Sequence, residues 1–197
     1  MSHSNRPLLS LYSAYGHRKY LNGGERRRFL AVTAALPRRE LATLCLVLAH
    51  TGCRISEALS LTHAAIAAGD GVVAIRCLKK RGNQMVYREL PLPPEVVETL
   101  CIVHGIRDGA PHQKLWSFSR SRAWRLVKAV MRSADIAPGP HATPKGLRHG
   151  FGLHAIRSGV PLNLVQKWLG HASLTTTAIY LQAVGAEERE FAARMWS

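Results

Sequence analysis

Glycine and proline divide this chain into short segments, and that punctuation limits the elements that it can form. In most segments apolar side chains recur three or four positions apart, the spacing of an amphipathic helix. We expect helices at residues 25–36, 38–50, 54–61, 95–104, 121–133, 143–158, 161–169, 173–184 and 186–196. One region differs, because residues 72–77 and 85–92 have the character of two strands joined by a basic turn. The sequence therefore predicts a mostly helical α+β domain with a small antiparallel hairpin or sheet.

The length and the charge of the chain indicate one domain that binds a polyanion. Its 197 residues suffice for one sizeable core but not for two ordinary domains. We expect an arm or irregular lead-in at residues 1–22, the domain at 23–184 and a C-terminal helix within 185–197. Lys and Arg number 27 against 12 Asp and Glu, a net charge of +15 that is spread along the whole chain. Such a distribution predicts a folded surface that binds phosphate groups.

Several other classes of protein lack support in the sequence. The longest apolar run, residues 41–49, is far shorter than the roughly 20 residues of a membrane span. The four cysteines lie far apart with no CxxC pair, which argues against a zinc knuckle and a disulfide scaffold. The motifs GxxxxGK[ST], HExxH and GxGxxG do not occur. We therefore expect a soluble, cytoplasmic protein that uses no metal, ATP or other cofactor.

One expected helix combines a buried face with a basic one. Ser121 is predicted to cap its N-terminus and Trp124 to lie in the core. Arg122, Arg125 and Lys128 fall on the remaining surface. These three cations are candidate contacts to a nucleic acid.

Three short motifs place cations and hydroxyl groups next to helix boundaries. TGCRISEAL spans residues 51–59, TPKGLRH spans 143–149, and LGHAS spans 169–173 with Tyr180 following nine residues after its histidine. In this order they resemble the three boxes of the tyrosine recombinases, also called the phage integrase family. The resemblance covers about residues 21–182 and implies the single catalytic domain of that family.

The resemblance implies a reaction in which Tyr180 attacks a DNA phosphodiester. The product would be a 3'-phosphotyrosyl link with loss of a 5'-hydroxyl, and religation would need no ATP. Arg54 and Arg148 suit the charge that develops on the non-bridging oxygens, because a planar guanidinium can hold two oxygens at once. His171 would donate a hydrogen bond to a non-bridging oxygen. Glu57, one helical turn after Arg54, would brace its neighbours.

The general acid has two candidates. In this family a lysine at the hairpin tip protonates the departing 5' oxygen, and both Lys79 and Lys80 occupy that region. Strand alternation lets only one of them point into the site, and Lys79 is favoured. General phosphate contacts are an equal alternative for Lys79, Lys80 and Arg81.

One position departs from the family pattern. The family usually has a histidine three residues before the second arginine, as a general base toward the tyrosine, and here Lys145 occupies that place. A lysine can donate to the phosphate, but as a base it requires a lowered pKa. His149 is common in the family's box and is expected to have a structural or supporting role.

The resemblance also implies binding partners, and it leaves alternative functions open. It implies double-stranded DNA, four protomers around two paired sites, and a last helix at 186–196 that reaches into a neighbour. The residues before the first box are too few for the family's usual N-terminal domain, so a catalytic domain alone is expected, similar to the short invertases that switch fimbrial promoters. Integration, excision, inversion and resolution all remain open. Two alternatives are a DNA-binding or regulatory module of the same fold and a type IB topoisomerase.

Overall fold

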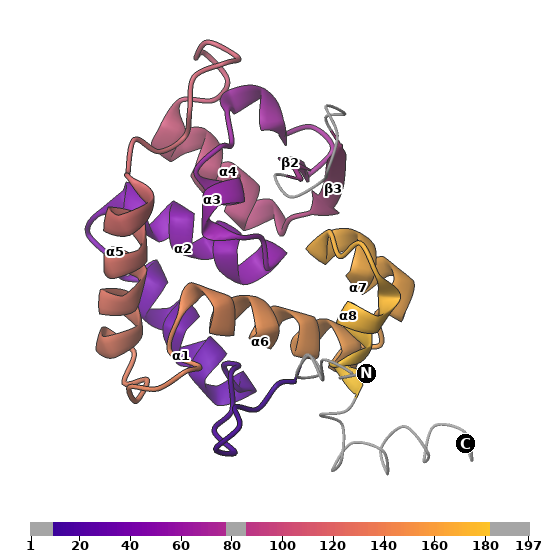
Figure 1. Ribbon diagram of the computed structural model, residues 1–197. Coiled ribbons are helices and arrows are strands. Elements are labelled where there is room, and N and C mark those ends of the chain that lie inside the picture. Colours follow the sequence, from indigo (N-terminus) through magenta and orange to yellow (C-terminus); the bar gives the residue numbers. More distant parts are fainter. Residues whose placement is uncertain (1–9, 78–85, 182–197) are drawn as a thin grey trace, which may run out of the picture.

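The computed structural model describes residues 10–77 and 86–181, which form a helical domain with a small sheet (Figure 1). In chain order the elements are α1 (Gly23–Ala34), α2 (Arg39–Thr51), α3 (Ile55–Ala58), the 3-10 helix η1 (His63–Ala65), β1 (Ile66–Ala67), β2 (Val72–Arg76), β3 (Tyr87–Pro91), α4 (Pro94–His104), α5 (Arg120–Ser133), α6 (Pro144–Arg157), α7 (Leu162–Leu169) and α8 (Leu174–Ala178). None of the helices in this part of the chain is long and apolar enough to cross a membrane. The predicted fold class is confirmed.

Helix α2 lies at the centre of the domain, with α1 and α5 on one side and α7 and α8 beyond its other end (Figure 1). It packs against α1, α4 and α6, so that nine of its thirteen residues are buried. The helix ends at Gly52, whose φ of +59° is left-handed. A Cβ at this position would lie 2.5 Å from the ring of Phe151, so only glycine fits. The left-handed turn and the missing side chain at Gly52 together let the chain that follows α2 pack closely against α6.

The sheet has three antiparallel strands in the order β1-β2-β3, one more than the predicted hairpin. The extra strand, β1, has two residues and pairs with the start of β2. In the β2–β3 register Val73 faces Leu90 and Ile75 faces Arg88. All four side chains are buried, so the inner face of the sheet contains an arginine.

Helix α5 corrects two expectations. Ser119, and not Ser121, caps its N-terminus by accepting a hydrogen bond from the backbone of Arg122. Trp124 was expected in the core and is 42% exposed, with the ammonium of Lys128 lying 5.2 Å from its ring centroid. The helix instead buries a narrower stripe of smaller side chains, Ala123, Val127, Val130 and Met131. The tryptophan lies at the edge of that stripe, where its ring contacts the ammonium of Lys128.

The ends of the predicted domain fit the structure to different degrees. Leu11 and Leu21 of the expected arm are buried, and Arg18 forms an ion pair with Glu25 of α1. Helix α8 is shorter than the helix expected at 173–184, and Tyr180 lies in the turn just after it. The predicted helix at 186–196 and the turn at 79–84 lie outside the described residues. The domain limits stay predictions.

Candidate active site

The three sequence boxes meet around the side chain of Arg148. This arginine lies on α6, and its two terminal nitrogens donate hydrogen bonds to the carbonyls of Gly52, at 2.8 Å, and Leu169, at 2.7 Å. Gly52 belongs to the first box and Leu169 to the third. Burial and the nearby charge of Arg54 lower the pKa of Arg148 to about 10, so it remains charged at neutral pH. Arg148 thus connects the boxes and brings a positive charge to their junction.

Glu57 joins two arginines on the other side of this junction. Its carboxylate accepts a hydrogen bond from Arg54 at 2.9 Å and another from Arg88 at 2.6 Å, and its side chain is fully buried. Burial alone would raise the pKa of Glu57, but the hydrogen bond and charge of Arg88, together with Arg54, lower it. The carboxylate is therefore ionised and holds the side chain of Arg54 in place.

Arg88 is a member of the site that sequence reasoning missed. Its side chain is 3% exposed, and besides Glu57 it donates to the carbonyl of Trp168 at 2.7 Å and to the sulfur of Cys77 at 3.2 Å. Although burial disfavours its charge, the hydrogen bond to Glu57 raises the pKa of Arg88. It links β3 to the end of α7, just before the third box. The alternation of side chains along β3 could have revealed it, because Arg88 lies on the same, buried face as Leu90.

We call these four charged residues the guanidinium cluster. Its members are Arg54, Glu57, Arg88 and Arg148. Three further residues on the C-terminal side form what we call the ring cluster. Its members are His149, His171 and Tyr180.

Tyr180 lies at the centre of the ring cluster and is fully buried. Its phenolic oxygen lies 3.2 Å from Nδ1 of His149, and its ring lies nearly parallel to that of His171, with 6.3 Å between centroids. Burial raises the pKa of Tyr180 to about 12, although the charges of Arg148 and Arg54 act in the opposite direction. Gly152 of α6 makes room for the phenol, since a Cβ there would lie 2.6 Å from the tyrosine ring.

Both histidines of the ring cluster are neutral at physiological pH. Burial, followed by the charges of Arg148 and Arg54, lowers the pKa of His171 to about 3. Burial, followed by the charges of Lys145, Arg148 and Lys19, lowers the pKa of His149 to about 4. Nδ1 of His171 lies 2.9 Å from the hydroxyl of Thr177, which fixes the orientation of this imidazole. A neutral imidazole has one nitrogen that donates and one that accepts.

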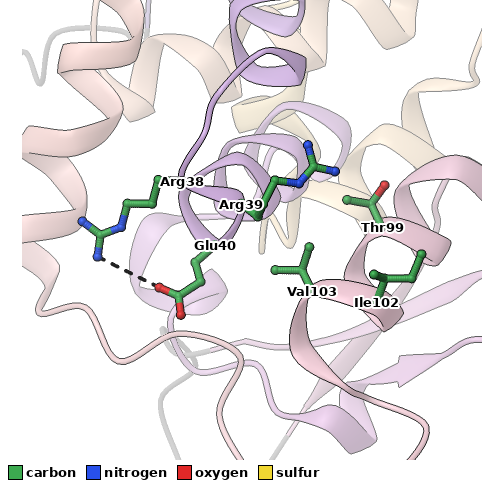
Figure 2. A pocket seen from close by; sticks show the side chains of 6 residues that line it. All are labelled: Arg38, Arg39, Glu40, Thr99, Ile102 and Val103. Carbon is green, nitrogen blue, oxygen red and sulfur yellow. Dashed lines mark ion pairs between the residues drawn. The ribbon is translucent and has the colours of Figure 1, made fainter.

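An open hollow of about 600 Å³ adjoins the site. Arg54, Arg88 and His171 line it, together with Lys167 of α7 and Tyr87 of β3. A phosphate in this hollow would therefore meet Arg54 and Arg88 of the guanidinium cluster, whereas Arg148 and Tyr180 do not line it. A second hollow, of about 480 Å³, lies between the start of α2 and α4 (Figure 2). Its lining is Arg38, Arg39, Glu40, Thr99, Ile102 and Val103, none of which belongs to either cluster.

The other predicted site residues lie on the surface or outside the described residues. Lys145, Arg122 and Arg125 are exposed, and Lys128 is half-buried beside Trp124. Three cations of the predicted turn lie outside the described residues: Lys79, Lys80 and Arg81. Within residues 10–77 and 86–181, no three His, Cys, Asp or Glu side chains gather closely enough to hold a metal ion.

Known proteins resemble this chain in both sequence and fold. The chain is 30% identical over 155 residues to the tyrosine recombinase XerA of Pyrococcus furiosus, which covers 75% of this chain and 51% of XerA. It is 32% identical over 155 residues to XerD of Neisseria meningitidis serogroup B, covering 72% of this chain and 50% of XerD. The chain thus spans about half the length of these two relatives.

Solved structures of recombinases also resemble this chain. The crystal structure of the XerA recombinase superposes with a TM-score of 0.74 at 25% identity, covering 89% of this chain and 64% of that one. The site-specific recombinase XerH, bound to a palindromic difH substrate in a post-cleavage complex, shares the fold with a TM-score of 0.74 at 24% identity, covering 97% of this chain and 57% of XerH. The sequence model of the phage integrase family matches residues 19–186, which include every member of both clusters. On these grounds the chain belongs to the phage integrase family, the tyrosine recombinases.

Proposed function

We propose that this chain is a site-specific recombinase that cleaves and rejoins duplex DNA through a 3'-phosphotyrosyl intermediate on Tyr180. The observation that carries the proposal is the convergence of the three boxes on one junction. There, Arg148 bonds to backbone carbonyls of the other two boxes, and Arg54 and Arg148 both act electrostatically on the phenol. A nucleophile and two fixed cations are what metal-independent attack on a phosphodiester needs.

The guanidinium cluster would hold the phosphate before and during the attack. Arg148 uses two of its N–H groups for backbone carbonyls, and Arg54 uses one nitrogen for Glu57. The remaining N–H groups of each planar fork can bind non-bridging oxygens. Because these cations are already in place, they would stabilise the charge that develops on phosphorus oxygens without further rearrangement.

The remaining roles are proposed from the resemblance to the family. His171 would donate a hydrogen bond to a non-bridging oxygen, and Lys79 or Lys80 would protonate the departing 5' oxygen. Lys145 would donate to the phosphate. The cations proposed to contact the DNA backbone are Arg81, Arg122, Arg125 and Lys128. XerH is described as bound to its difH substrate, which supports duplex DNA as the partner here; four protomers on two paired sites are proposed as the assembly.

The proposal is tested by trapping DNA on Tyr180 in cells. Cells that express the chain are lysed in SDS, and DNA that stays attached to the protein is recovered and sequenced. A nicked duplex with the recovered sequence should then give an SDS-resistant adduct with the purified protein. Tyr180→Phe should abolish the adduct, because the side chain then lacks the attacking oxygen. Tyr15→Phe is the matched control, since Tyr15 is 87% exposed and far along the chain from the boxes.

Two other outcomes would contradict the proposal. Failure to recover any protein-linked DNA, together with a gel shift of duplex DNA by the purified protein, would indicate a DNA-binding or regulatory module. Relaxation of a supercoiled plasmid that lacks the recovered sequence would indicate a topoisomerase, because such an enzyme needs no paired site.

A further inference from the structure

We propose that His149, and not Lys145, is the general base that takes the proton from Tyr180. The inference rests on the proposed recombinase function and adds a catalytic residue to it. Nδ1 of His149 lies 3.2 Å from the phenolic oxygen, within hydrogen-bond reach of the proton that must leave. Family resemblance gives the base to the position of Lys145, so the geometry and the resemblance point to different residues.

Lys145 is poorly suited to accept this proton. Its side chain is exposed at the start of α6, and an ammonium group has three donors and no lone pair. Its charge has a different consequence, because Lys145 is one turn before His149 on the same helix and lowers the pKa of that imidazole. Burial is the larger cause of that lowered pKa, and the charge of Lys145 adds to it.

Burial and the charges of three cations all favour the neutral form of His149. Lys145 and Arg148 face it from α6, and Lys19 faces it from the segment before α1. Two further neighbours, His171 and Tyr180, are the uncharged members of the ring cluster. With burial these cations lower the pKa of His149 to about 4, so at neutral pH the ring has a lone pair. In the tautomer with the proton on Nε2, the lone pair is on Nδ1, and Nδ1 can accept a hydrogen bond from the phenol.

The proton balance of the step is complete. The phenolic oxygen of Tyr180 forms its bond to phosphorus while its proton passes to Nδ1 of His149, and the bond from phosphorus to the 5' oxygen breaks. The 5' oxygen takes its proton from the general acid at the hairpin tip. On religation the imidazolium returns its proton to the departing phenolic oxygen.

The pKa values of Tyr180 and His149 fit a proton transfer that takes place during the attack on phosphorus. The pKa of the resting phenol is about 12, which makes a free phenolate rare at neutral pH. Once its oxygen bonds to phosphorus, the same proton becomes strongly acidic. A base with a pKa of about 4 lies between these limits, so it can take the proton during bond formation.

The test compares His149→Asn with Lys145→Gln on the nicked duplex recovered by trapping. The asparagine amide oxygen can accept the phenol's hydrogen bond but cannot take its proton, so Tyr180 keeps its place. We expect adduct formation by H149N at pH 7 to be about 10²-fold slower or more. Its rate should rise about tenfold per pH unit, because the phenol must then ionise on its own. K145Q should also slow the reaction, because a phosphate donor is lost, but its rate should not rise tenfold per pH unit near pH 7, since His149 still takes the proton.

A second measurement separates loss of the base from misfolding. A fluorinated tyrosine whose phenol ionises near neutral pH is placed at position 180. It should restore the rate of H149N at pH 7 to within about tenfold of wild type, because an ionised nucleophile needs no base. The same substitution should not restore K145Q. Restoration also shows that H149N folds and binds the duplex.

Three results would overturn the inference. H149N could cleave as fast as wild type or faster, which would mean that His149 only holds the phenol at rest. K145Q could show the slow, pH-dependent cleavage instead, which would return the base to Lys145. Wild-type protein that yields no protein-linked DNA in cells would overturn the proposed function, and the role of His149 with it. The first two results leave the proposed function standing.

Discussion

The guanidinium cluster and the ring cluster meet in one site but are held in different ways. In the guanidinium cluster Glu57 pairs with two arginines, and Arg148 bonds to two backbone carbonyls. In the ring cluster single side-chain hydrogen bonds connect neutral groups, at 3.2 Å from Tyr180 to His149 and at 2.9 Å from His171 to Thr177. One half therefore presents a fixed charge, and the other keeps its protons available for transfer. We expect changes in the first half to affect stability and the reaction together, and changes in the second to affect mainly the reaction.

The largest expected effect follows from Glu57→Gln. This change leaves the charges of Arg54 and Arg88 without their carboxylate in a buried place, and we expect it to lower the free energy of unfolding by about 3–5 kcal/mol. Urea denaturation at pH 7 measures the loss. Glu89→Gln is the matched control, because Glu89 is exposed on the same strand as Arg88. A loss below about 1 kcal/mol, the range of surface pairs, would show that this half is not held by its ion pairs.

A smaller effect is expected at the boundary between α6 and Tyr180. Gly152→Ala would place a methyl group 2.6 Å from the tyrosine ring and push the phenol out of its buried position. We expect a loss of about 1–3 kcal/mol in the free energy of unfolding, as for an overpacked core. The pKa of Tyr180 should fall from about 12 toward the ordinary value near 10, because burial is what raises it. The ultraviolet titration of the variant, with Tyr180→Phe subtracted, measures that pKa.

The control for this change is Gly69→Ala. A Cβ at Gly69 meets nothing within 4 Å, so the same gain of a methyl group should leave the titration of Tyr180 unchanged. An unchanged pKa in Gly152→Ala would mean that the phenol stays buried and that the ring cluster accommodates the methyl group.

Sequence reasoning found the parts of the site that lie within local motifs. Arg54, Arg148, His171 and Tyr180 each sit in or just after a box at a helix boundary, and family membership is confirmed by the comparisons. Their roles in the reaction stay proposals. Helix positions also followed from the spacing of apolar residues, because that periodicity is a local property.

The parts that sequence reasoning missed depend on contacts between distant segments. Arg88 reads as one more cation of a basic hairpin until the register places it opposite Ile75, on the face that meets Glu57. Trp124 reads as core by its size, but the packing of α5 buries the smaller residues beside it. The contact between His149 and Tyr180 joins α6 to the turn after α8 and has no signal in either segment alone.

The smallest expected effect tests whether the ring cluster can change by itself. Thr177→Val keeps the shape of a buried side chain but removes the hydroxyl that lies 2.9 Å from Nδ1 of His171. One lost hydrogen bond of this kind costs about 1 kcal/mol, so urea denaturation should show a loss near that size. The imidazole should also lose the contact that fixes its orientation, which nitrogen NMR of His171 detects as a change in its Nδ1 signal, while the signals of the arginine side chains stay in place. Thr175→Val, at an exposed position of α8, should change neither. If the signals of Arg54 or Arg88 moved together with those of His171, the two clusters would be one coupled unit, because removing a neutral hydroxyl should not disturb groups that Glu57 and backbone carbonyls hold.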